Sequence, residues 1–176
     1  LLLRAQRPII YTGGGVVLSG AAKQLTTLVE RLGHPCTNTL MGLGALASDH
    51  PKFLGMLGMH GTYEANMAMY ECDVMLAVGA RFDDRVTGDL KKFSPNAKII
   101  HIDIDPASIG KNVSVEVPIV GDAGAALEQL LEALEQTSVE QDTESLAQWW
   151  GQIDAWRGRD SLGYDSSDEV IKPQFV

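Results

Sequence analysis

An apolar run that leads directly into glycine constrains the fold of this chain most. Residues 73–78 read Asp-Val-Met-Leu-Ala-Val and are followed at once by Gly79 and Ala80. A continuous apolar run of this length, bounded by glycine, predicts a buried strand. Ligands of open α/β sheets bind beyond the carboxyl ends of such strands, and a glycine there lets the backbone come close to them. We therefore expect an α/β sheet with a ligand site at its edge.

A turn dense in fixed charge follows this strand. Two arginines and two aspartates fall within the five positions from Arg81 to Arg85. Guanidinium groups pair with phosphate and carboxylate groups, and carboxylates accept hydrogen bonds from hydroxyls. The turn therefore suggests an anionic ligand that carries hydroxyls, with a solvated surface turn as the alternative.

The same arrangement recurs along the chain. Four further runs predict strands that end in glycine or aspartate, at residues 7–11, 35–40, 98–105 and 117–120. Apolar residues at helical spacing predict helices over residues 21–32, 62–71, 122–134 and 145–157. This alternation predicts an open parallel sheet of about six strands with helices on both faces, a Rossmann-like α/β fold.

Three segments add detail to the expected ligand edge. Gly13-Gly14-Gly15 follows the first strand but lacks the spacing GxGxxG. Residues 54–61, Leu-Gly-Met-Leu-Gly-Met-His-Gly, suit neither helix nor strand, so we interpret them as backbone lying flat against a planar ligand or as a buried Met-rich loop. Asp103, near the end of the strand at 98–105, is placed to accept from ribose hydroxyls, or to cap a turn before Pro106.

Composition narrows the function classes. A chain of 176 residues predicts one domain, and the absence of an 18-residue apolar run predicts no membrane span. The net charge of −9 argues against a nucleic-acid partner. Eleven acids and three bases lie from Glu128 onward, so the acidity belongs to the C-terminal helices and tail. Cys36 and Cys72, both in apolar surroundings, predict reduced core thiols, a cytoplasmic protein and no metal site.

Together these motifs resemble the catalytic large subunit of acetohydroxyacid synthase, also called acetolactate synthase. The resemblance rests on residues 11–15, 39–44, 54–61, 78–85, 101–106 and 171–174. The segments GMLGMHG and GARFDDR are specific to that family when they occur together. Because the chain starts without a methionine, we expect it to be a piece of a longer protein.

The resemblance implies a thiamine-diphosphate enzyme with three α/β domains. Residues 1–158 would be its central FAD-binding domain, and residues 159–176 a linker toward a C-terminal diphosphate-binding domain. The full-length enzyme would condense pyruvate with a second 2-keto acid, pyruvate or 2-ketobutyrate, in the biosynthesis of valine, isoleucine and the other branched-chain amino acids. Other domains would hold thiamine diphosphate and Mg²⁺, so this chain alone would not catalyse.

The same resemblance implies a homodimer or homotetramer that binds a small regulatory subunit. Two alternatives stay open from the residues. One is a related thiamine-diphosphate carboligase, such as a glyoxylate carboligase. The other is a non-catalytic nucleotide-binding module, since a fold does not fix a function.

The family's FAD contacts carry over to positions that follow the predicted strands. Positions expected at the isoalloxazine ring and ribitol are Thr39, Leu40, Met41, Gly58, Met59, His60 and Gly61. Positions expected at the phosphates, the ribitol and the centre of FAD are Gly13, Gly14, Gly15, Gly79, Ala80, Arg81, Asp83, Arg85 and Val86. Positions expected at the adenosine end are Asp103, Ile104, Gly121, Asp122 and Ala123.

Arg85 has a second implied role. In the family this arginine points toward the active site and is linked to the carboxylate of the second keto acid. A guanidinium suits that role because its planar fork matches a carboxylate. The resemblance therefore makes Arg85 the one candidate catalytic residue of this chain.

Overall fold

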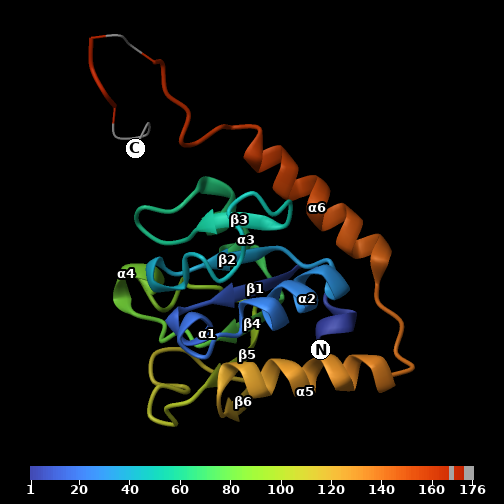
Figure 1. Cartoon of the computed structure of the whole chain (residues 1–176). Helices are drawn as coiled ribbons and strands as arrows, with labels where there is room; N and C mark the ends of the chain where they lie inside the picture. The colour runs from blue at the N-terminus through green and yellow to red at the C-terminus, as the bar shows by residue number, and fades with distance from the viewer. Residues whose placement is uncertain (167–168, 173–176) are drawn as a thin grey trace.

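The computed structural model describes residues 1–166 and 169–172. Figure 1 shows its strands stacked as one sheet between helices. The strands are β1 (Pro8–Thr12), β2 (Cys36–Asn38), β3 (Phe53–Met56), β4 (Val74–Val78), β5 (Lys98–Asp103) and β6 (Val117–Val120). The α-helices are α1 (Gly14–Leu18), α2 (Ala22–Leu32), α3 (Tyr63–Glu71), α4 (Asp84–Thr87), α5 (Ala123–Gln136) and α6 (Thr143–Arg157), with short 3₁₀ turns η1 (Leu2–Arg4) and η2 (Leu40–Gly42).

All strand pairs of the sheet are parallel, in the order β3-β2-β1-β4-β5-β6. The chain winds outward from β1 to β3, then returns to place β4 beside β1. This doubly wound order confirms the predicted Rossmann-like α/β fold. In doubly wound sheets, ligands bind in the crevice beyond the carboxyl ends of the strands where the winding reverses, and those strands are β1 and β4 in this chain.

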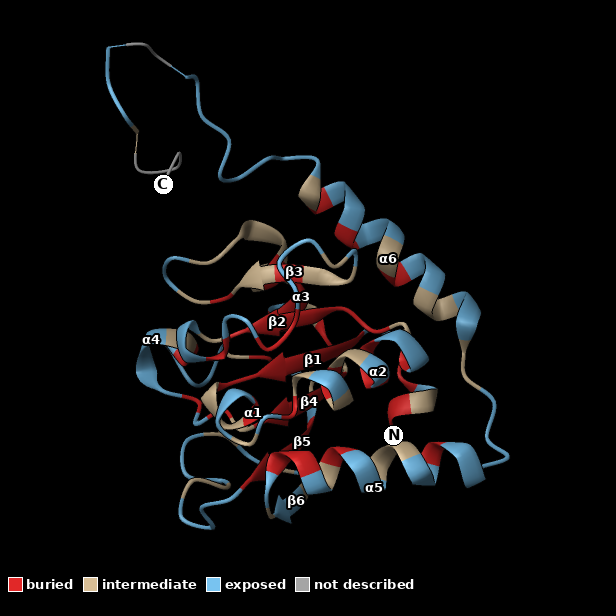
Figure 2. Cartoon of the chain, in the orientation of Figure 1, coloured by how far each residue is buried: buried red, intermediate tan, exposed pale blue. Residues whose placement is uncertain are grey.

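The two faces of the sheet pack against different helices. Successive side chains of a strand point to opposite faces, so β1 sends Ile10 to one core and Ile9 and Tyr11 to the other. The first core packs under α2 and α5, and the second under α3 and α6. Strands β1 and β4 are buried along their whole length, as Figure 2 shows, which explains why residues 73–78 read as an unbroken apolar run.

Local capping signals predicted several helix ends correctly. The Thr62 hydroxyl accepts a hydrogen bond from the Ala65 N–H, and the Asp122 carboxylate accepts one from the Ala125 N–H. Gly33 ends α2 in the left-handed conformation, at φ 68°. The tryptophans of α6 pack on this domain, since Trp149 and Trp156 are buried and their rings meet edge to face at 5.5 Å.

The interpretation of residues 54–61 as neither helix nor strand was wrong for its first half, because β3 spans Phe53–Met56. The pairing of β2 with β3 shifts register between Cys36 and Asn38, where β3 holds an extra residue and Gly55 adopts φ 85°. Such an arrangement is a β-bulge, and glycine supplies its left-handed backbone. The glycine that argued against a strand therefore marks a bulge within one.

Two other element boundaries differ from the expectation. A short helix, α1, begins at Gly14 inside the triple-glycine loop. The second strand ends at Asn38, and residues 40–42 form the 3₁₀ turn η2 in place of strand. In both cases the chain turns away as soon as it leaves the sheet, because it then packs against the loop of the neighbouring strand.

The described residues beyond α6, 159–166 and 169–172, contain no helix or strand. Pro173 and Gln174, part of the last family motif, lie outside the described residues. Among the helices of the described segments, none is long and apolar enough to cross a membrane.

Candidate functional site

The predicted site residues lie along one edge of the sheet. Each group follows the carboxyl end of a different strand, so the parallel order brings them all to the same edge (Figure 1). Adjacent strands are about 4.8 Å apart, so six strands span about 24 Å. Only an elongated ligand can reach residues along this whole edge.

The loops after β1 and β4 meet backbone to backbone at the crevice. A Cβ built on Gly13 would lie 2.1 Å from the Gly79 oxygen, and one on Gly79 would lie 2.6 Å from the Gly15 Cα. Gly79 also has φ 59°, which favours glycine. The loops after β1 and β4 can lie this close only because Gly13 and Gly79 have no side chains. This contact also leaves the centre of the crevice without side chains.

Phe82 fixes the charged turn after β4. Its ring is buried and packs against the rings of Tyr11, Phe93 and His101 at centroid distances of 5.4, 5.9 and 5.0 Å. Its backbone has φ 55°, and its carbonyl oxygen accepts a hydrogen bond from Asn112 Nδ2 at 2.9 Å. An apolar side chain anchored inward thus leaves its polar neighbours facing outward.

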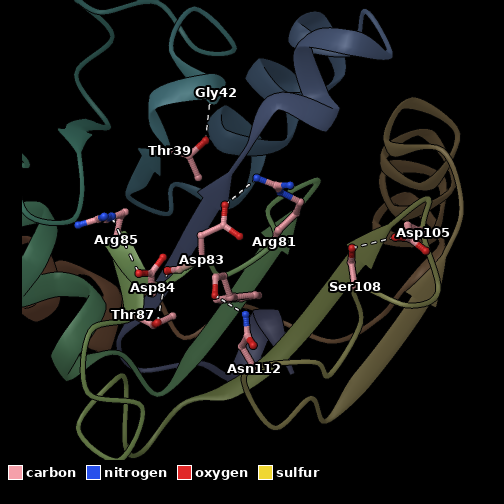
Figure 3. A network of polar contacts seen from close by, with 11 residues as sticks. Thr39, Gly42, Arg81, Asp83, Asp84, Arg85, Thr87, Asp105, Ser108 and Asn112 are labelled. Carbon is pink, nitrogen blue, oxygen red and sulfur yellow. Dashed lines mark hydrogen bonds and ion pairs between the residues drawn. The ribbon is translucent and has the colours of Figure 1, made fainter.

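Those neighbours are Arg81 and Asp83, which point toward each other in Figure 3. Arg81 Nη2 lies 2.7 Å from Asp83 Oδ2, and the Arg81 side chain is 70% exposed. An exposed ion pair contributes little stability. The guanidinium is therefore able to exchange its carboxylate partner for a phosphate of a ligand.

Arg85 lies on α4, and its side chain is 81% exposed. Its nearest acidic partner is Asp84, with Nε and Oδ2 4.0 Å apart, as drawn in Figure 3. A Cβ on Gly58 would lie 3.0 Å from the Arg85 carbonyl oxygen. The structure therefore brings the Gly58–Gly61 loop and α4 into contact, although the sequence separates them by more than 20 residues.

Apolar side chains project from the same edge. Leu40 and Met41 on η2, Met59 after β3 and Ile104 after β5 are between 68% and 74% exposed. Large apolar side chains left open beside an arginine suit a flat aromatic group that continues into a charged one.

Besides the pair Arg81 and Asp83, several predicted residues face inward or already have a hydrogen-bond partner. The side chains of Ala80 and Ala123 are buried, so only their backbone can contact a ligand. Asp103 is 8% exposed, and its Oδ1 accepts from the Asp105 N–H. The Asp122 carboxylate caps α5.

Sequence reasoning missed several buried polar groups behind the edge. His101 Nε2 lies 2.8 Å from the Ala80 oxygen, and since a carbonyl only accepts, Nε2 carries the proton. Burial lowers the pKa of the His101 imidazole. Burial also raises the pKa of the Tyr11 hydroxyl, and the negative charge of Asp83 raises it further. Asn38 connects the end of β1 to η2, because its Oδ1 accepts from the Thr12 hydroxyl and its Nδ2 donates to the Gly42 oxygen. An asparagine within a strand was the available signal, because strands disfavour it.

With the fold and the edge described, comparison with known proteins assigns the class. Residues 1–130 match the family described as thiamine pyrophosphate enzyme, central domain, and the chain belongs to that family. It is 53% identical over 175 residues to the acetolactate synthase isozyme 3 large subunit of Escherichia coli K12. It is 50% identical to the acetolactate synthase large subunit of Haemophilus influenzae and 49% identical to a probable one of Methanococcus aeolicus.

These alignments cover 99%, 99% and 100% of this chain, but only 30% of each relative. The chain thus spans about a third of the length of the curated relatives that it matches. The identities confirm the resemblance to the middle domain of acetolactate synthase large subunits that the motifs indicated.

Proposed function

We propose that this chain binds FAD as the central domain of an acetolactate synthase large subunit. Residues 1–158 form that domain, and residues 159–176 lead toward a C-terminal diphosphate-binding domain. The whole protein condenses pyruvate with a second 2-keto acid, pyruvate or 2-ketobutyrate, for branched-chain amino acid biosynthesis. It works in the cytoplasm as a homo-oligomer with a small regulatory subunit.

The order of the strands carries this proposal. The residues expected at the isoalloxazine ring follow β3 and β2, those at the phosphates and centre follow β1 and β4, and those at the adenosine follow β5 and β6. Along the sheet order β3-β2-β1-β4-β5-β6, the expected contacts therefore run from the isoalloxazine end of FAD to its adenosine end. The roles carried over from the family's motifs therefore form a linear series along this edge, which supports one extended ligand lying across the strand ends.

The side chains along the edge fit the chemistry of each part. Exposed Leu40, Met41 and Met59 suit the flat flavin ring, and the exposed guanidinium of Arg81 suits the phosphates. One carboxylate oxygen of Asp103 accepts from the Asp105 N–H, and the other lies 3.9 Å from His101 Nε2, so a ribose hydroxyl would share that second oxygen with the imidazole.

Catalysis needs groups beyond these residues. Thiamine diphosphate with Mg²⁺, held by other parts of the protein, supplies the decarboxylation of pyruvate and the transfer of its two-carbon unit. The residues of this chain hold FAD and, through Arg85, orient the carboxylate of the second keto acid. The side chain of Arg85 is open for that contact, since its nearest carboxylate is 4.0 Å away.

Titration with FAD tests the proposal. We expect saturable one-to-one binding, read by flavin fluorescence, by this chain or by the protein with its flanking domains. Arg81→Ala should weaken binding about 10- to 100-fold, since a charged hydrogen bond contributes about 1.5–3 kcal/mol. Lys92→Ala, at another exposed cation, should leave the affinity unchanged. If the protein with all its domains takes up no FAD, the proposal fails.

A further inference from the structure

The loop after β3 is held by one side chain on α3, Asn66. The Gly58 N–H donates to Asn66 Oδ1 at 2.9 Å, and Asn66 Nδ2 donates to the Gly58 oxygen at 3.0 Å. The same Nδ2 donates to the Thr62 oxygen at 3.0 Å. The amide thus uses both donors and its acceptor on backbone groups. The loop is closed further by the Gly61 N–H, which donates to the Gly58 oxygen at 3.0 Å.

Gly58 also touches the segment that carries Arg85. It adopts φ 101°, and a Cβ there would lie 3.0 Å from the Arg85 oxygen and 3.6 Å from the Val86 Cα. The Val86 Cγ2 atom also lies 3.7 Å from that position, so the two segments are closely packed here. The residue that fixes Gly58 therefore also fixes how Met59 and His60 stand relative to α4.

The region beside Asn66 has room for movement. A cavity of about 190 Å³ lies between α3 and residues 86–94, and Asn66, Val86 and Lys92 are among its lining residues. If the amide were removed, the loop would have space to shift without unfolding the sheet.

We propose that Asn66 is a positioning residue for the candidate site, which holds the Gly58–Gly61 turn against the backbone of α4. It touches no ligand itself, because its polar atoms are all engaged with backbone groups. The expected effect of Asn66 on FAD affinity rests on the proposed function. The state of the turn can be measured without any ligand.

Asn66→Ala is the first test, in the protein with its flanking domains. Without the amide, we expect hydrogen–deuterium exchange in peptides covering residues 57–62 to accelerate about tenfold, with exchange in β1 and β4 unchanged. The dissociation constant for FAD should rise about tenfold, as expected for losing about one net hydrogen bond's contribution. Asn96→Ala, at an exposed asparagine, is the matched control.

Asn66→Asp separates positioning from general damage to α3. A carboxylate keeps the acceptor for the Gly58 N–H but turns a negative oxygen toward two carbonyls, whereas a protonated carboxyl can donate again. We therefore expect the loss of FAD affinity in Asn66→Asp, relative to the native protein at the same pH, to become smaller as pH falls from 8 to 5. The loss of affinity in Asn66→Ala should stay the same over that range. Asp89, Lys92 and the Tyr70 hydroxyl, which line the same cavity, are the titratable groups beside the new carboxyl that influence this titration.

The outcomes are distinct. Unchanged exchange of the turn in Asn66→Ala, or faster exchange throughout the sheet, overturns the inference. A loosened turn with unaltered FAD affinity overturns the positioning role. A loosened turn in a protein whose native form binds no FAD supports the role of Asn66 in holding the turn and sinks the proposed function instead.

Discussion

The edge of the sheet where the strands begin, the amino edge, and the edge where they end, the carboxyl edge, differ in what covers them. At the amino edge, side chains of α6 donate to backbone oxygens. Trp149 Nε1 donates to Pro8 and Arg157 Nη2 to Phe53, at the starts of β1 and β3, and Trp150 Nε1 donates to Gly33, which ends α2. At the carboxyl edge, the side chains of Met41, Met59 and Arg81 are exposed. The amino edge is thus covered by a helix that hydrogen-bonds to it, whereas the carboxyl edge keeps large apolar and charged side chains exposed.

The family match sharpens this contrast. It covers residues 1–130 and therefore includes the whole carboxyl edge but not α6. The helix that closes the amino edge lies beyond the matched region and buries Trp149, Ile153 and Trp156 against α3 and the sheet. Under the proposed function, α6 serves stability and the carboxyl edge serves binding, and each prediction below tests one side of that division.

The largest effect is expected for Trp149→Ala. This ring is 2% exposed, packs edge to face on Trp156 and donates to the Pro8 oxygen at 3.0 Å. Removing it leaves a cavity and an unsatisfied carbonyl, which should cost about 3–5 kcal/mol of unfolding free energy. Urea denaturation measures this loss.

Trp149→Phe is the control for the ring. It keeps much of the packing and loses the hydrogen bond, so we expect a loss of about 1–2 kcal/mol. The folded fraction of either variant should bind FAD with native affinity. A weaker flavin site in folded Trp149→Phe would contradict the division between the two edges.

His34, also at the amino edge, makes stability depend on pH. It is 1% exposed, and burial lowers its pKa from 6.5 to about 4, although Asp73 opposes the shift. Between these values the unfolded chain binds the proton and the folded chain does not. Stability is therefore complete above pH 6.5 and falls as pH drops toward 4, by about 3 kcal/mol from this group.

The measurement is urea unfolding between pH 7 and pH 4. His34→Asn should flatten the pH slope over that range, whatever its effect on absolute stability, and His60→Asn at an exposed position is the control. An unchanged slope in His34→Asn would show that other groups govern the acid sensitivity.

Gly79→Ala tests whether the carboxyl edge is only a binding surface. The new Cβ would meet the Gly15 Cα at 2.6 Å in a left-handed backbone, so we expect a loss of about 2–3 kcal/mol. Gly121→Ala is the matched control, because nothing lies within 4 Å of its Cβ position. Thermal unfolding measures the stability of both variants. Equal stability of Gly79→Ala and Gly121→Ala would mean that the loops after β1 and β4 can move apart at little cost in free energy.

Local signals made much of the fold predictable. Strand β4 is a continuous apolar run because both of its faces are buried, and Thr62, Asp122 and Gly33 mark helix ends through contacts within four residues. Strand β3 was missed because its bulge glycine is decided by pairing with β2, which lies outside any local window. The strand order is equally non-local, so no periodicity could reveal it.

The same distinction applies to the candidate site. The residues at the edge were predicted from family motifs, but the side chains that hold them were not. Asn112 reaches Phe82 across 30 residues, and His101 reaches Ala80 across 21. Each is an ordinary polar residue in sequence, and only the folded chain shows which carbonyl it meets.

The smallest effect is expected at the carboxyl edge itself, for Arg85→Lys in the full-length protein. Lysine keeps the charge but loses the planar fork that pairs with a carboxylate, so use of the second keto acid should weaken about 5- to 10-fold in KM. Release of CO₂ from pyruvate should change little, and the unfolding free energy should stay within about 0.5 kcal/mol at this exposed position. Arg4→Lys, before β1, should alter neither step. Equal losses in both steps would assign Arg85 to holding FAD alone, and the carboxyl edge would then bind the cofactor without taking part in the choice of acceptor.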